Sequence, residues 1–82
     1  MKAYQVYEGG TDKHENQYYK LIATYLDKDK ALAHSKMIAE AVQLHGDILE
    51  YNEYDNGKCL SWNAHGWISI TIAETREIDI TE

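Results

Sequence analysis

The sequence predicts an α+β fold in which a single helix packs on a five-stranded antiparallel sheet. One stretch, residues 28–45, has helical periodicity, and short runs typical of strands lie on both sides of it. The pair Asn56-Gly57 is typical of a two-residue hairpin turn, because a type I′ turn needs positive φ at both positions. At 82 residues, the chain is expected to form a single domain, residues 1–82.

Two strands are predicted before the helix. Residues 2–8 (KAYQVYE) and residues 18–26 (YYKLIATYL) carry the tyrosine and β-branched side chains that favour strands. The segment between them is polar and begins at Gly9-Gly10, which indicates a loop. We reject a phosphate-binding loop here, since no helix and no Lys-Ser/Thr pair follows the glycines. A hairpin with a long loop is the simplest connection.

The helix has recognisable start and stop signals. Asp27 is the expected N-cap, and the negative charge of Asp29 is favourable near the positive N-terminal end of the helix dipole. Gly46 is expected to end the helix as its C′ residue, a position that often holds glycine. The residues predicted to share the sheet-facing side are Ala31, His34, Ser35, Ile38, Ala41, Val42 and His45.

The apolar arc of this helix is wider than one sheet needs to cover. Leu32, Met37 and Leu44 extend it, so they are candidates for an interface with a second copy or with a target protein. The alternative is that loops cover these side chains or that they are simply exposed, as single apolar residues commonly are.

Three strands are predicted after the helix. The Asn56-Gly57 turn pairs Asp55 with Lys58, and it continues with Glu53 opposite Leu60 and Tyr51 opposite Trp62. For the next connection we expect a three-residue loop, residues 64–66, with Gly66 in a left-handed bulge position. This register pairs Trp62 with Ile68 and Leu60 with Ile70. It creates one apolar face from Leu49, Tyr51, Leu60, Trp62, Ile68, Ile70 and Ile72.

The element order is therefore β-β-α-β-β-β. The third strand then runs in the same direction as the second. The simplest closure places the third strand beside the first and antiparallel to it, which gives the spatial order 2-1-3-4-5. A right-handed crossover favours this arrangement.

The net charge of −6 lies entirely in the second half of the chain. Residues 1–46 carry six acids and six lysines, whereas residues 47–82 carry eight acids against Lys58 and Arg76. An acidic half repels phosphates, so direct binding to nucleic acid is disfavoured. The expected partner is a protein with a basic surface, including one that normally holds nucleic acid. The alternative is that the acids only maintain solubility.

The candidate protein-binding residues lie around the first C-terminal hairpin. Glu50, Asn52, Tyr54 and Trp67 are predicted on the outer face of the sheet, where an aromatic side chain beside acids suits docking on a basic protein. With the neighbouring acids, the predicted acidic–aromatic site consists of Glu50, Asn52, Glu53, Tyr54, Asp55 and Trp67.

No catalytic or metal centre is predicted. His34 and His45 lie roughly 16 Å apart along the helix, too far to share a metal ion. Cys59 and His65 have no further soft ligand nearby, and no histidine is placed beside Cys59 or Ser61 to act as a base. We therefore expect a non-enzymatic protein with no cofactor and no metal.

The sequence also predicts a cytoplasmic location and no membrane partner. The start of the chain, MKAYQVYEGG, lacks the apolar run of a signal peptide, and no apolar run approaches the ~20 residues of a membrane span.

Residues 30–70, KALAHSKMIAEAVQLHGDILEYNEYDNGKCLSWNAHGWISI, resemble the central part of small phage-encoded proteins, among them type I-F anti-CRISPR inhibitors with a strand–helix–strand–strand–strand core. The shared features are an alanine-rich helix, an aliphatic strand after His45-Gly46, a glycine turn and a tryptophan-bearing hairpin. The resemblance covers about half of the chain. It implies a phage or mobile-element protein that inhibits a host nucleic-acid-handling complex by protein–protein contact. No binding residue is carried over, because the family example is basic and this chain is acidic.

Three hypotheses follow. The leading one is an acidic binding protein that inhibits or modulates a host nucleic-acid-handling complex. The second is a small structural or regulatory homodimer joined through Leu32, Met37 and Leu44. The third is a small-ligand or metal-binding module, which a thermal-shift screen would detect.

Overall fold

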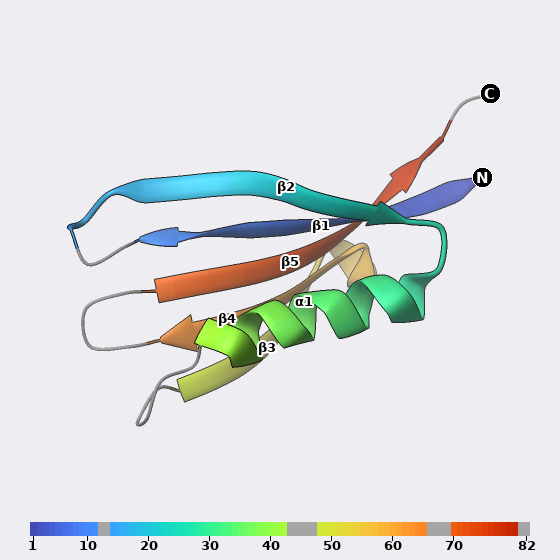
Figure 1. Ribbon diagram of the computed structural model, residues 1–82. Helices are drawn as coiled ribbons and strands as arrows, with labels where there is room; N and C mark the ends of the chain where they lie inside the picture. The colour runs from blue at the N-terminus through green and yellow to red at the C-terminus, as the bar shows by residue number, and fades with distance from the viewer. Residues whose placement is uncertain (12–13, 43–47, 66–69, 81–82) are drawn as a thin grey trace.

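A computed structural model describes residues 1–11, 14–42, 48–65 and 70–80 of the chain (Figure 1). It confirms the α+β class, with one helix on a five-stranded antiparallel sheet and the order β-β-α-β-β-β. The elements are β1 (Lys2–Thr11), β2 (Gln17–Tyr25), α1 (Lys28–Val42), β3 (Ile48–Tyr54), a short 3₁₀ turn (Asp55–Gly57), β4 (Cys59–His65) and β5 (Ile70–Asp79).

The strands lie in the order β2-β1-β5-β4-β3, so the predicted spatial order 2-1-3-4-5 is wrong. β5, not β3, lies beside β1, and their pairing runs without a shift from Lys2↔Asp79 to Thr11↔Ile70. The physical reason is length: β1 and β5 each have 10 residues, whereas β3 has 7. The longer strand satisfies more of the backbone hydrogen-bonding groups of β1. β3 becomes an edge strand and, as predicted, runs in the direction of β2.

α1 lies across one face of the sheet and contacts β1, β5, β4 and β2 (Figure 1). The predicted N-cap is confirmed, since Oδ1 of Asp27 accepts hydrogen bonds from the backbone N–H of Asp29 (2.9 Å) and Lys30 (3.4 Å). Of the residues predicted to face the sheet, Ala31 and Ser35 are fully buried, His34 and Ile38 are half-buried, and Ala41 is exposed.

The contact between α1 and the sheet is made by small side chains. Ala39, which is not among the residues predicted to face the sheet, is fully buried together with Ala31 and Ser35. Thr75 of β5 donates a hydrogen bond from its hydroxyl to Oγ of Ser35 (3.0 Å), and Ser35 in turn donates to the carbonyl of Leu32 (3.0 Å). These buried hydroxyls are therefore satisfied within the helix–sheet interface.

The β3–β4 hairpin follows the predicted register. Glu53 pairs with Leu60 and Tyr51 pairs with Trp62. Asn56 (φ 56°) and Gly57 (φ 85°) both have positive φ, and the N–H of Lys58 donates to the carbonyl of Asp55 at 3.1 Å. Asn56 and Gly57 thus form the hairpin turn that their backbone preferences predict.

The predicted register between β4 and β5 is wrong. His65 pairs with Ile70, Asn63 with Ile72 and Trp62 with Ala73, so the connection is residues 66–69 rather than residues 64–66. The change in pairing reverses which face of the sheet each β5 residue occupies, because side chains alternate along a strand.

As a result, the isoleucines of β5 do not face the helix. Thr71, Ala73 and Thr75 lie on the α1 side and are buried, whereas Ile72 is half-buried and Ile70 is 39% exposed on the opposite side. The small residues of α1 bring the helix close to the sheet, and only small β5 side chains fit beneath it. The prediction rested on the apolar pattern and on Gly66 as a bulge residue, and neither indicates how close the helix lies to the sheet. Ile68 lies outside the described residues.

Candidate functional site

The structure places the predicted acidic–aromatic site at a free edge of the sheet. Within the described part of the chain, β3 pairs only with β4. Glu50, Asn52 and Tyr54 share the outer face, away from α1. Glu53 lies on the α1 side, because it pairs with Leu60, whose partner on β5 faces the helix.

Asp55 lies in the turn directly after Tyr54, so five of the six predicted residues follow one another along the edge and the hairpin tip. Trp67, the sixth, lies outside the described residues. Glu50, Glu53 and Asp55 are all exposed, and so is the ring of Tyr54, at 51%.

Sequence reasoning missed one aromatic side chain of this edge. Tyr51 was predicted to contribute to the core, yet it is 42% exposed. Its ring packs against Trp62 at a centroid distance of 4.7 Å, and its hydroxyl donates to Oε1 of Glu53 at 3.3 Å. Partial burial, and then the charge of Glu53, raise the pKa of Tyr51, so the hydroxyl remains a donor at neutral pH. No sequence signal indicated this exposure, because the predicted strand order 2-1-3-4-5 placed β3 inside the sheet, whereas it lies at an edge.

Within the part of the chain that the structure describes, the negative charges of Glu53 and Asp55 are available to a partner. Two of the three acids of β5 form ion pairs: Glu74 bonds Arg76 at 3.0 Å, and Glu77 bonds Lys2 at 2.9 Å. By contrast, no ion pair holds Glu53 or Asp55 among the residues that the structure describes.

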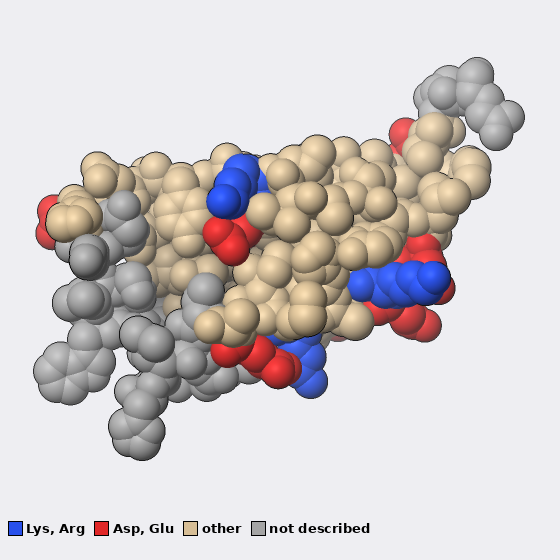
Figure 2. Space-filling model, viewed as in Figure 1, with Lys and Arg blue, Asp and Glu red and all other residues tan. Residues whose placement is uncertain are grey.

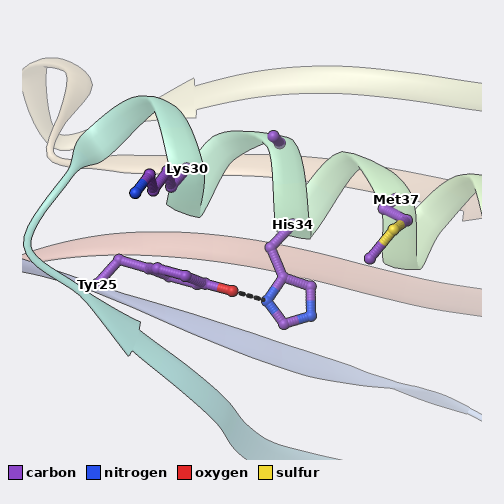
Figure 3. A pocket seen from close by; sticks show the side chains of 5 residues that line it. Tyr25, Lys30, His34 and Met37 are labelled. Carbon is purple, nitrogen blue, oxygen red and sulfur yellow. Dashed lines mark hydrogen bonds between the residues drawn. The ribbon is translucent and has the colours of Figure 1, made fainter.

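The helix residues predicted as an alternative interface are only partly accessible. Met37 is 60% exposed, Leu32 is half-buried, and Leu44 lies outside the described residues. Met37 lines an open hollow of about 470 Å³ between α1 and the end of β2, together with Tyr25, Lys30, Ala33 and His34 (Figure 3). In Figure 2, lysine and acidic side chains border an uncharged area on this face of the molecule.

One hydrogen bond links two of the residues that line this hollow. The hydroxyl of Tyr25 lies 2.8 Å from Nδ1 of His34, and the two rings meet edge to face at 5.7 Å (Figure 3). When Tyr25 donates, Nε2 of His34 carries the ring proton. The pair therefore orients the imidazole. Beside it, Ala33 and Met37 provide a shallow apolar wall.

The outer face holds the cysteine and the serine that were considered as nucleophiles. Burial, with a smaller effect from the charge of Glu74, raises the pKa of the Cys59 thiol, which stays protonated at neutral pH. Ser61 is buried and donates to Oδ1 of Asn63 at 2.6 Å, not to a base. Among the side chains that the structure describes, no oriented base of the kind that nucleophilic catalysis needs lies beside Cys59 or Ser61.

Two further properties concern metals and membranes. Among the described residues, no three His, Cys, Asp or Glu side chains gather to hold a metal ion. The one described helix, α1, is too short and too polar to cross a membrane.

No protein-family model matches this chain, and no curated protein or solved structure matches it either.

Proposed function

We propose that the protein is a non-enzymatic binding protein that docks its acidic β3 edge on a basic surface of a nucleic-acid-handling protein. By occupying the place where phosphates bind, it inhibits or modulates that partner. The observation that supports this proposal is the pair Glu53 and Asp55, whose carboxylates form no ion pair with any described residue, beside two exposed tyrosines, Tyr51 and Tyr54. The resemblance of residues 30–70 to phage inhibitors supports a phage or mobile-element protein with a cytoplasmic host target.

The two kinds of side chain contribute differently to such docking. Carboxylates attract arginine and lysine, which accelerates encounter and makes binding depend on salt. Tyrosine rings supply apolar contact area and a hydroxyl at the same place, and tyrosine is among the residues that most often anchor interfaces. Charge thus favours a basic partner, while Tyr51 and Tyr54 provide the contact that stabilises the complex.

Removing the three charges should weaken binding. The test variant combines Glu50→Gln, Glu53→Gln and Asp55→Asn, and the matched control combines Glu15→Gln, Glu40→Gln and Asp79→Asn at exposed positions outside β3 and its turn. Wild-type protein is used to capture partners from a nuclease-treated bacterial lysate, and each captured protein is purified. We expect the β3 variant to bind it at least about tenfold more weakly, and the control to bind as the wild type does.

The same purified partner tests inhibition. Adding wild-type protein should displace a labelled DNA duplex from it, measured by fluorescence anisotropy, and the β3 variant should displace the duplex poorly. Equal affinity of wild type and β3 variant, or a duplex that stays bound at saturation, would contradict the proposed function.

A homodimer through α1 is the second candidate, and the 60% exposure of Met37 favours it. In that case Met37→Lys should convert dimers into monomers, as measured by light scattering over a dilution series. A wild-type protein that is monomeric at every concentration would rule this candidate out.

A further inference from the structure

We infer that the free edge of β3 receives an extended, arginine- and lysine-rich segment of the partner as an additional strand of the sheet. This inference rests on the proposed function, since it gives the form of the basic surface that binds. An edge strand leaves alternate backbone N–H and C=O groups unpaired, and these groups are a template for another chain. β3 pairs with β4 from Ile48↔His65 to Tyr54↔Cys59 without a shift, so the edge is regular.

The side chains of β3 select a basic occupant. Glu50 lies on the outer face and Glu53 on the α1 side, so a strand beside β3 would meet one carboxylate on each face. Cross-strand neighbours have Cβ atoms ~4.5–5.5 Å apart, close enough for opposite charges to pair. Asp55 adds a third exposed acid where β3 ends. A basic side chain on the α1 side of the added strand therefore meets Glu53, and one near the end of β3 meets Asp55.

Aromatic rings also flank the edge on both faces. Tyr54 lies on the outer face and Tyr51 on the α1 side, and both are exposed. Such rings cover the aliphatic stems of long basic side chains and attract their charge. The α1 side already holds one such contact, because the ammonium of Lys36 lies 5.3 Å from the ring centroid of Trp62, the cross-strand neighbour of Tyr51.

The opposite edge of the sheet, β2, does not suit this occupant. It contains no acid, and its charged residue is Lys20, which lies 3.9 Å from Glu8. Its pairing with β1 also shifts between Val6 and Tyr7, which leaves Ile22 as a bulge residue. A bulge interrupts the regular edge that an added strand requires.

A second copy of this chain is disfavoured at β3 by the same acids. Pairing two β3 edges would bring two sets of Glu50, Glu53 and Asp55 into one interface, and like charges across a strand pair are destabilising. The acids thus prevent self-association at this edge and favour a segment of opposite charge.

The test uses the full chain, labelled with ¹⁵N, and a short capped peptide of alternating arginine and valine. Peptide binding should slow hydrogen exchange at alternate backbone amides within residues 50–54, by about tenfold or more, because alternate N–H groups point toward the added strand. A control peptide of the same sequence, methylated at every backbone nitrogen, keeps the charge but loses the donors. It should bind at least about tenfold more weakly, measured by fluorescence anisotropy.

The outcomes separate strand addition from charge-driven docking. If the methylated peptide binds as tightly and no β3 amide is protected, strand addition is wrong, while binding that is lost in the β3 variant and at high salt still supports the proposed function. An acidic peptide of alternating glutamate and valine that binds equally well would overturn the inference. So would β3 amides that become protected without peptide as the protein concentration rises, since a second copy would then occupy the edge. If the β3 variant binds the basic peptide as the wild type does, the acidic site itself is wrong.

Discussion

Replacing Gly10 by alanine should lower the free energy of unfolding by about 3 kcal/mol or more, the sum of two effects. Gly10 has a φ of 143°, a region that is essentially restricted to glycine. A Cβ at this position would also overlap the backbone carbonyl of Ile70, on the neighbouring strand β5. Backbone cannot move aside as a flexible side chain can, so β1 and β5 would separate at this end. Urea denaturation followed by circular dichroism measures the change.

Gly57 provides the matched control. It too has positive φ, at 85°, but an added Cβ would meet no atom within 4 Å. Gly57→Ala should therefore cost only the strain of the left-handed backbone, about 1 kcal/mol. Equal losses for Gly10→Ala and Gly57→Ala would show that the close approach to Ile70 has no effect on stability.

Truncating Val6 to alanine should cost about 2 kcal/mol, because it removes buried methyl groups and leaves a cavity. Val6 is fully buried on the α1 side, directly across from Thr75, whose hydroxyl bonds the helix at Ser35. The cavity would lie in the centre of the helix–sheet interface, where close-packed neighbours relax only partly. Thermal and urea unfolding both measure this loss.

Leu21→Ala on β2 serves as the comparison, since Leu21 is 50% exposed. Removing its side chain should change the free energy of unfolding by under about 1 kcal/mol. If Leu21→Ala lowered the free energy of unfolding as much as Val6→Ala does, the side chain of Leu21 would have to be buried rather than half exposed, which would contradict the structure.

The parts of the fold that were predictable are those that local chemistry decides. The Asp27 cap depends on hydrogen bonds within three residues, and the Asn56-Gly57 turn depends on the preferences of two residues. Once the turn is given, the pairing of Glu53 with Leu60 follows by counting. None of these features requires knowledge of the rest of the chain.

The strand order and the β4–β5 register depend instead on contacts between distant segments. The register was chosen to bring Ile70 and Ile72 under the helix, yet Thr75 and Ala73 lie there. Deciding between them requires the distance between α1 and the sheet, which the sequence pattern does not state. The placement of β5 beside β1 likewise depends on the full lengths of both strands, and predicted strand ends are uncertain by a few residues.

The candidate site was predicted in part. The alternation of side chains along β3 correctly predicted that Glu50 and Glu53 lie on opposite faces of the sheet. The position of β3 at an edge, where its backbone is accessible, became known only from the observed strand order. Tyr51 was missed because an apolar pattern assigned it to the core, although an edge residue has one side open. The contact of Tyr25 with His34 joins the end of one strand to the second turn of the helix, which periodicity alone does not place.

The central position of β5 has a consequence for the order in which the molecule forms. Two local hairpins, β1–β2 and β3–β4, are joined in the sheet by β5, which lies between β1 and β4. β5 is also the last of the five strands to leave the ribosome. Until then the inner edge of β1 and the inner edge of β4 are both uncovered. Pairing such distant segments slows folding and lengthens the time during which open edges can associate. Rapid insertion of β5 between β1 and β4 therefore shortens the time during which both edges are exposed, and a ribosome that pauses before β5 would prolong it.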